Sequence, residues 1–102
     1  MSRREKIQAM LAKEPDDVFL NFGLAMEWAK EGNVESALAQ FDRVLELDAT
    51  YTGAYFHKGN TLIAAGRGDE AREVLTRGVA VAQRQGNDHA AEEMTGLLRE
   101  IV

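Results

Sequence analysis

The apolar side chains of residues 34–47 recur at three- and four-residue spacing, which is the period of one face of an α-helix. This stripe contains Val34, Leu38, Phe41, Val44, Leu45 and Leu47. A second stripe, near the C-terminus, contains Ala90, Ala91, Met94, Leu97, Leu98 and Ile101. A single proline and many Ala, Leu, Glu and Arg residues favour helices over strands in the rest of the chain. The pattern predicts six helices, at residues 3–13, 17–31, 34–47, 52–65, 69–84 and 88–101.

Five residues mark where these helices begin and end. Ser2 and Glu5 form a capping-box pattern that starts the first helix, and Pro15 limits its end. Gly32 and Gly66 each fall where a predicted helix ends, and glycine adopts the left-handed backbone of such an end without steric cost. The glycines therefore predict turns between successive helices.

The sequence repeats itself with a period of 34 residues and no gap. A shift by this period superposes small residues on small residues and apolar residues on apolar residues. The matched pairs are Ala25 with Gly59, Trp28 with Leu62, Gly32 with Gly66, Ala37 with Ala71, and Phe41 with Leu75. The same step backwards places Phe41 on Ile7 and Leu45 on Leu11, which indicates that the N-terminal segment is half a repeat.

This pattern resembles the tetratricopeptide repeat family, in the form of a small bacterial-type member. The matching residues of the first repeat are Leu24, Ala25, Trp28, Gly32, Ala37, Phe41 and Val44, and those of the second are Tyr55, Gly59, Leu62, Gly66, Ala71 and Leu75. The sequence departs from the family pattern at three positions: Asn21 replaces a large aromatic residue, Lys58 an apolar one and Ala49 a proline.

The resemblance implies an all-α solenoid of helical hairpins, an α-α superhelix of about six helices, in a single domain over residues 1–102. Its predicted parts are an N-terminal half-repeat helix at 3–13, repeat one at 18–51, repeat two at 52–85 and a C-terminal capping helix at 88–101. A polar outer face on the last helix fits the capping role, because an open-ended stack needs one for solubility.

The resemblance also implies a function, since the first helices of such repeats line a concave groove that receives a peptide. The groove positions correspond to Phe19, Phe22, Met26, Lys30, Phe56, His57, Asn60 and Ile63. We therefore expect a non-catalytic scaffold or adaptor that binds an apolar peptide or helix of a partner protein. Some relatives clamp a terminal carboxylate here, but Phe22 and Phe56 stand where that clamp needs a cation.

Two other uses of the same apolar positions remain open. The terminal helices of the chain could cover Phe19, Phe22 and Met26, which would make them part of the core. Alternatively, the chain could be a self-associating structural protein that uses the patch as a homodimer interface.

The net charge of −5 argues against a nucleic-acid partner, because phosphate binding needs concentrated positive charge. The charge is also uneven along the chain. Residues 1–15 carry four basic and two acidic side chains, whereas residues 16–49 carry two basic and eight acidic ones. This asymmetry indicates either solvated helix faces or a docking patch.

No apolar run reaches the roughly 18 residues that span a bilayer, and the N-terminus lacks the apolar core of a secretion signal. We expect a soluble, cytoplasmic protein with no membrane partner. The absence of cysteine excludes disulfides and thiolate metal sites.

The segment "GRGDEA" at residues 66–71 contains an Arg-Gly-Asp tripeptide and also fits a dinucleotide-binding fingerprint. One period earlier, the equivalent of "TLIAAGRGDEA" is "EWAKEGNVESA", whose charges are incompatible with the buried strand that the fingerprint requires. The segment is therefore interpreted as a helix boundary, with Asp69 and Glu70 in the first turn of a helix.

The remaining candidates for chemistry are few. Ser2 and Ser36 are the only serines, and neither lies in a nucleophile-elbow pattern. We expect no catalytic residues, cofactor or metal, and hence no enzyme. A metal-binding or enzymatic role through His57 or His89 is kept as an alternative, since His89, Glu92 and Glu93 share one side of a helix.

Overall fold

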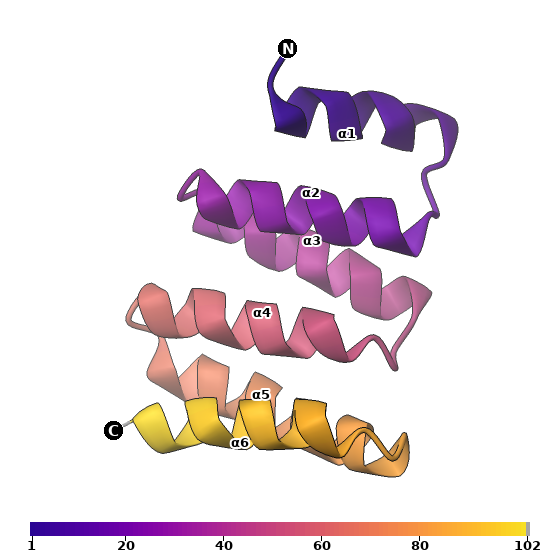
Figure 1. Cartoon of the computed structure of the whole chain (residues 1–102). Coiled ribbons are helices and arrows are strands. Elements are labelled where there is room, and N and C mark those ends of the chain that lie inside the picture. Colours follow the sequence, from indigo (N-terminus) through magenta and orange to yellow (C-terminus); the bar gives the residue numbers. More distant parts are fainter. Residues whose placement is uncertain (102) are drawn as a thin grey trace. The chain divides into compact units, whose positions relative to one another are not determined.

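Six helices follow one another along the chain in a computed structural model that describes residues 1–101, and no strand occurs in that range (Figure 1). They are α1 (Arg3–Lys13), α2 (Val18–Lys30), α3 (Val34–Leu47), α4 (Thr52–Ala64), α5 (Gly68–Arg84) and α6 (Asp88–Glu100). The predicted all-α fold class is confirmed, and each predicted helix lies within one residue of its observed bounds. The division of one domain into repeats at 18–51 and 52–85 stays a prediction.

By internal packing the chain forms two compact units, Met1–Ala49 and a second unit that begins at Thr50. In the N-terminal unit, α2 and α3 pack against each other as a hairpin and α1 packs on α2. Leu24, Ala25, Ala37 and Phe41 are buried between the helices, as the repeat pattern predicts. The two alanines are fully buried, so the backbones approach closely where the sequence provides small residues.

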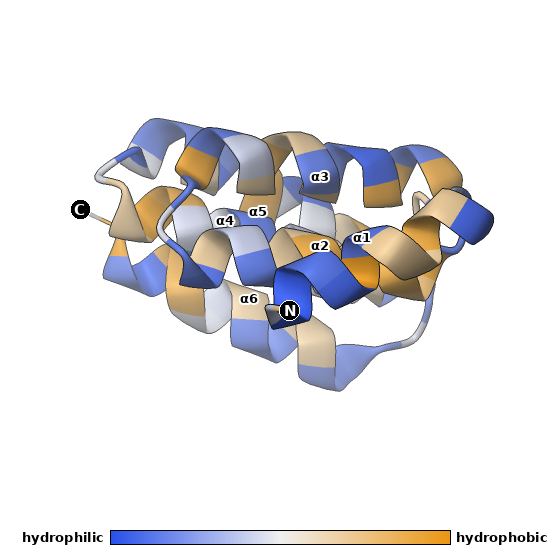
Figure 2. Ribbon diagram, turned by 90° about the horizontal axis from the view of Figure 1, so that it is seen from above, coloured by the Kyte–Doolittle hydropathy of each residue, from blue (hydrophilic) through white to orange (hydrophobic). Residues whose placement is uncertain are grey.

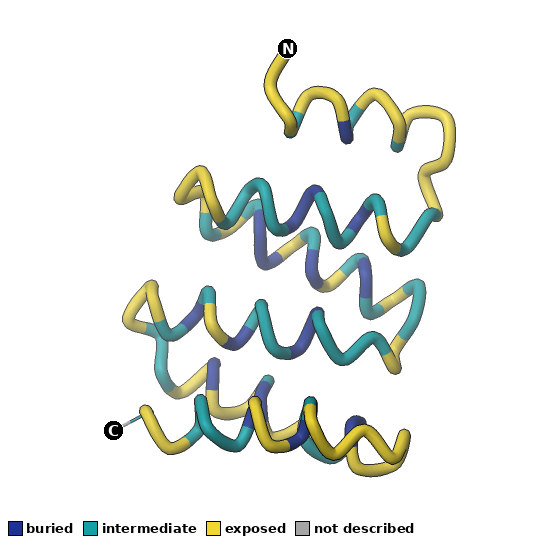
Figure 3. The backbone as a smooth tube through the Cα atoms, in the orientation of Figure 1, coloured by how far each residue is buried: buried dark blue, intermediate teal, exposed yellow. Residues whose placement is uncertain are grey.

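Helix α1 is held on α2 by one apolar contact and a cation stacked on an aromatic ring. Ile7 is the buried residue of α1, which is exposed along most of its length (Figure 3). A methyl group added at Gly23 of α2 would lie 3.6 Å from Ile7 Cδ1. The guanidinium of Arg4 lies 4.5 Å from the centre of the Trp28 ring, and Arg4 Nε donates a hydrogen bond to Glu31. Figure 2 shows that α1 changes from hydrophilic at its first turn to largely hydrophobic in its second half.

Asn21, the departure from the family pattern in repeat one, is buried with only 3 % of its surface exposed. Its amide nitrogen donates to the carbonyl oxygens of Pro15, at 3.0 Å, and Asp17, at 2.8 Å. Its side-chain oxygen accepts a hydrogen bond from Gln40 Nε2 of α3 at 2.6 Å. The polar side chain thus ties the entry loop of α2 to both helices of the hairpin, where an aromatic residue would fill space.

In the C-terminal unit, α4 and α5 form a hairpin and α6 packs on both of them. Leu62, Leu75 and Met94 are fully buried at the junction of the three helices. Two glycines allow this packing. A methyl group added at Gly59 would lie 2.4 Å from Leu75 Cδ2, and one added at Gly78 would lie 2.6 Å from both Tyr55 Cβ and Met94 Sδ. Side chains larger than hydrogen therefore do not fit at these two positions without movement.

The helix ends follow the local chemistry of the sequence. Ser2 and Glu5 form the predicted capping box, with both reciprocal hydrogen bonds present. Gly32 and Gly66 have φ values of 79° and 75°, which confirms the predicted left-handed helix ends. Gly86 ends α5 in the same way, with a φ of 69°.

Candidate functional site

The face of α2 predicted to contact a partner is open at its two ends and partly covered in the middle. Phe19 is 73 % exposed in the first turn of α2, and Lys30 is exposed in its last turn. Met26 and Phe22 are half-buried. The ring of Phe22 packs on Phe41 of α3, with ring centroids 6.1 Å apart and planes inclined by 57°. Phe22 thus stabilises the hairpin, whereas Phe19 faces solvent.

The α1 helix leaves Phe19 uncovered, so the hypothesis that terminal helices bury this residue is wrong for the N-terminal unit. Phe22 and Met26 are half-buried, and Phe22 packs on Phe41 of α3, which is not a terminal helix. Phe19 is the one exposed phenylalanine, tyrosine or tryptophan within residues 1–101, and transfer of such a ring from water to an apolar surface is favourable.

On α4, the four predicted residues differ in how far they reach solvent. Asn60 is exposed, whereas Phe56, His57 and Ile63 are half-buried. The rings of Phe56 and His57 meet edge to face, with centroids 5.0 Å apart and planes at 82°. Because these two residues are consecutive in α4, their ring contact arises within the helix itself.

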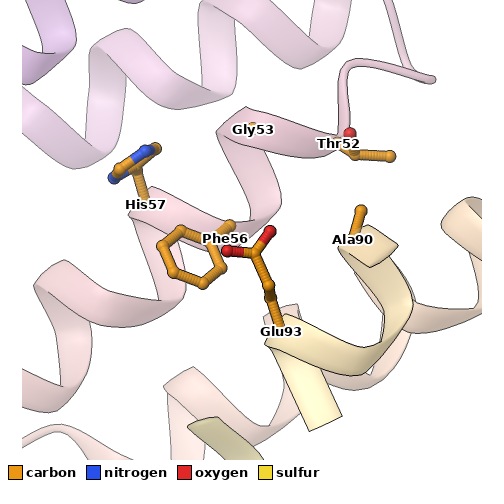
Figure 4. Close-up of a pocket in the computed structure, with 6 residues that line it drawn as sticks. All are labelled: Thr52, Gly53, Phe56, His57, Ala90 and Glu93. Atoms are coloured by element: carbon orange, nitrogen blue, oxygen red, sulfur yellow. The ribbon is translucent and has the colours of Figure 1, made fainter. Parts of the chain in front are cut away.

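A depression of about 150 Å³ lies between α4 and α6 in the C-terminal unit. It is lined by Thr52, Gly53, Phe56, His57, Ala90 and Glu93. Figure 4 shows the carboxylate of Glu93 reaching from α6 toward α4, beside the Phe56 ring. The C-terminal helix thus covers part of the predicted α4 face and adds an acidic group to it. The sequence pattern does not predict that Glu93 lies beside Phe56, because their proximity depends on how α6 packs against α4.

The surroundings of His57 change its proton affinity. Burial lowers the pKa of His57 below its ordinary value, and the negative charge of Glu93 partly offsets this effect. Because the unfolded chain takes up this proton at a higher pH than the folded chain does, stability falls as the pH drops below about 6.5. The loss levels off below the pKa of the folded state.

We predict that the pKa of His57, measured by NMR in the folded protein, is lower than its pKa in the urea-unfolded chain. Glu93→Gln should lower the pKa of His57 further, because it removes the charge that favours protonation. Glu92→Gln, at an exposed neighbouring position of α6, is the matched control for the change in net charge. A pKa of His57 above the unfolded value would refute the environment described for this side chain.

The metal alternative has little geometric support in residues 1–101. His89 Nε2 and Glu93 Oε1 lie 3.5 Å apart on the surface of α6. No group of three or more His, Cys, Asp or Glu side chains suited to a metal ion occurs in this range. None of the helices in the described part of the chain has the length and apolar character needed to cross a membrane.

The segment "GRGDEA" forms the turn between α4 and α5 and the start of α5. Gly66 is left-handed, and Arg67 occupies the N-cap position of the helix that begins at Gly68, without a side-chain capping hydrogen bond. Asp69 and Glu70 lie in the first turn of α5, as predicted. Both carboxylates pair with arginines, Glu70 with Arg67 at 2.8 Å and Asp69 with Arg72 at 3.2 Å.

Comparison with known proteins agrees with these observations. The profile of the tetratricopeptide repeat matches residues 29–93. A TPR repeat-containing protein of Pseudomonas aeruginosa is 34 % identical over 97 residues, which cover 95 % of this chain and 92 % of that protein. The solution structure of a protein from Bordetella parapertussis is similar with a TM-score of 0.88 and 31 % identity, over 99 % of this chain and 88 % of that one.

A more distant neighbour is PcrH, solved in complex with the chaperone binding region of PopD. It has a TM-score of 0.88 at 20 % identity, over 96 % of this chain and 74 % of that one, and this likeness concerns the fold alone. Helical hairpins with small residues at their crossings and left-handed glycines at their ends define a helical-repeat protein. This chain belongs to the tetratricopeptide repeat family.

Proposed function

We propose that the protein is a non-catalytic adaptor that binds an apolar segment of a partner protein through the exposed faces of α2 and α4. The observation that carries this proposal is Phe19, a large aromatic side chain that is 73 % exposed on a helix whose other large apolar residues are buried or half-buried. Membership of an interaction family supports it, as does the neighbour solved with a segment of another protein. We propose that Phe19, Met26 and Lys30 on α2, and Phe56, His57, Asn60 and Ile63 on α4, contact the partner.

An apolar partner segment would gain most at the aromatic positions. Burial of a phenylalanine side chain contributes roughly 1.5–3 kcal/mol, which exceeds the contribution of an exposed ion pair. Aromatic anchors surrounded by polar residues are typical of the energetic centre of an interface. Lys30 and Asn60, both exposed, would then orient the partner.

Phe19→Glu tests the proposal with little effect on the fold. The position is exposed and lies in the first turn of α2, where a carboxylate is favourable to the helix dipole. Proteins captured with the wild-type chain should be lost with the variant, and calorimetry on the partner segment should show a binding loss of at least about tenfold. Ala39→Glu, at an exposed position of α3, is the matched control and should bind normally.

Retention of the partner by Phe19→Glu would contradict the proposed binding face. The rival function, a homodimer, makes a different prediction. Sedimentation would then show a wild-type dimer that dissociates in Phe19→Glu, whereas the adaptor is expected to sediment as a monomer at all concentrations. Phe22→Glu is a poor substitute for this test, because Phe22 packs on Phe41 and its replacement would damage the hairpin.

A further inference from the structure

Four side chains of α1 share one side of the helix. Arg3, Lys6, Met10 and Lys13 recur at three- and four-residue spacing, and all four are exposed. Three of them are basic, and Met10 is one of three large apolar side chains that are exposed within residues 1–101. The stripe therefore combines positive charge with an apolar side chain that is 47 % exposed to solvent.

Two contacts show on which flank of α2 this stripe lies. Arg3 pairs with Glu27 at 3.5 Å, whereas Arg4, on the other side of α1, stacks on Trp28. On α2, Glu27 borders the face that carries Phe19, Met26 and Lys30, and Trp28 points away from it. The stripe of α1 and the open face of α2 are therefore on the same side of the N-terminal unit.

The register of the two antiparallel helices then brings Met10 close to Phe19. Arg3 lies opposite Glu27, and one turn later Ile7 lies opposite Gly23. One further turn on each helix brings Leu11, which is half-buried, opposite Phe19, and Met10 precedes Leu11 on the exposed side of α1. Met10 and Phe19 therefore lie at the same level of the two helices, with Lys6 and Lys13 one turn away from Met10 on α1.

The charge of this face is predominantly positive. Lys6, Lys13 and Lys30 make no ion pair with any residue of the described part of the chain. The nearby acidic side chains are mostly engaged: Glu27 pairs with Arg3, Asp16 with Arg43 at 2.7 Å, and Asp17 caps α2 through the amide of Leu20. Glu14, exposed at the end of α1, and Asp17, whose carboxylate keeps its charge when it accepts an amide hydrogen bond, are the remaining opposing charges.

We propose that this basic-apolar face, made of Lys6, Met10, Lys13, Phe19 and Lys30, selects partner segments that carry acidic residues around an apolar side. This inference rests on the proposed function and specifies the chemical character of the partner segment. The face is positive although the chain has a net charge of −5. Since charges are screened beyond about 8 Å at physiological salt, the nearby lysines dominate the field that a docked segment experiences. Opposite charges around an apolar contact favour one partner and its orientation.

The test uses two synthetic amphipathic helices of about 18 residues, five turns long, with leucines on one side. In one peptide glutamates flank the leucines, and in the other peptide glutamines replace these glutamates. By calorimetry at low salt, the wild-type protein should bind the glutamate peptide about tenfold more tightly than the glutamine peptide. The preference should shrink when the salt is raised.

The variant Lys6→Gln/Lys13→Gln should lose most of this preference. Its matched control is Arg84→Gln/Arg99→Gln, which removes two exposed charges from the C-terminal unit and should retain the preference. Met10→Gln should weaken the binding of both peptides equally, because it removes apolar contact and no charge.

Five results would overturn the inference. Equal binding of both peptides would leave the proposed function intact and exclude selection by charge, whereas binding of neither peptide would reject the proposed function as well. A preference that persists in Lys6→Gln/Lys13→Gln would place the selecting charges elsewhere. If the wild-type protein binds phosphatidylserine vesicles and this variant does not, the face binds a membrane. If the wild-type protein self-associates and this variant does not, the face binds a second copy of the chain.

Discussion

Gly78→Leu is expected to lower the free energy of unfolding by about 3 kcal/mol, at the upper end of the range for overpacking, and Gly78→Ala by about 1–3 kcal/mol. The first added carbon alone would lie 2.6 Å from Tyr55 Cβ, an atom bonded directly to the backbone of α4. It would also lie 2.6 Å from the sulfur of Met94, which is fully buried. Either α4 or α6 must therefore move away from α5.

Urea unfolding followed by circular dichroism would measure this effect, and the melting temperature should fall by about 4–8 °C per kcal/mol. Gly96→Ala in α6 is the control, because a methyl group there meets no atom within 4 Å. It should stabilise the chain by about 0.5–1 kcal/mol through helix propensity. A neutral Gly78→Leu would mean that the observed register of α5 against α4 and α6 is wrong.

Asn21→Ala is expected to cost about 1–3 kcal/mol, because it removes three hydrogen bonds from a buried site. Asn21→Leu should not restore stability, since the amide of Gln40 would still lose its partner while the apolar side chain meets two backbone carbonyl oxygens. Chemical denaturation of both variants would measure the losses.

A double-mutant cycle with Gln40→Ala isolates the contact between the two side chains. We expect a coupling energy of at least about 0.5 kcal/mol, since the donor and acceptor lie 2.6 Å apart. Asn60→Ala, which removes an exposed asparagine from α4, is the control and should change stability by less than about 0.5 kcal/mol. Additive losses for Asn21→Ala and Gln40→Ala would show that the two amides act independently.

The helices and their turns could be predicted because each depends on local sequence. The stripe in residues 34–47, the capping box at Ser2 and the glycines at 32 and 66 all act over one or two helical turns. Gly86 also has a left-handed backbone. The repeat pattern did not predict it, because the residue one period earlier is Thr52 rather than a glycine. Asn21 could not be interpreted, because its partners Pro15 and Gln40 come from other elements.

The sequence predicted which side of a helix each candidate residue occupies, but not how far each side chain is exposed. Spacing places Phe19, Phe22 and Met26 on one side of α2, yet only the packing shows that Phe22 contacts Phe41 while Phe19 faces water. On α4, the approach of Glu93 to Phe56 depends on the fold of α6 and has no signature in either segment. The role of the basic N-terminal residues required the Arg3–Glu27 contact, since charge counts alone do not distinguish a solvated helix from a docking surface.

Chemical-shift mapping of the backbone and side chains shows directly which residues of α2 and α4 contact a partner. The ligand is the partner segment that is captured by the wild-type protein and lost with Phe19→Glu, added stepwise to isotope-labelled protein. The largest shifts are expected at Phe19, Met26 and Lys30 of α2 and at Asn60 and Ile63 of α4. Shifts concentrated on the exposed sides of α3 and α5, around Ala39 and Glu73, would contradict this expectation.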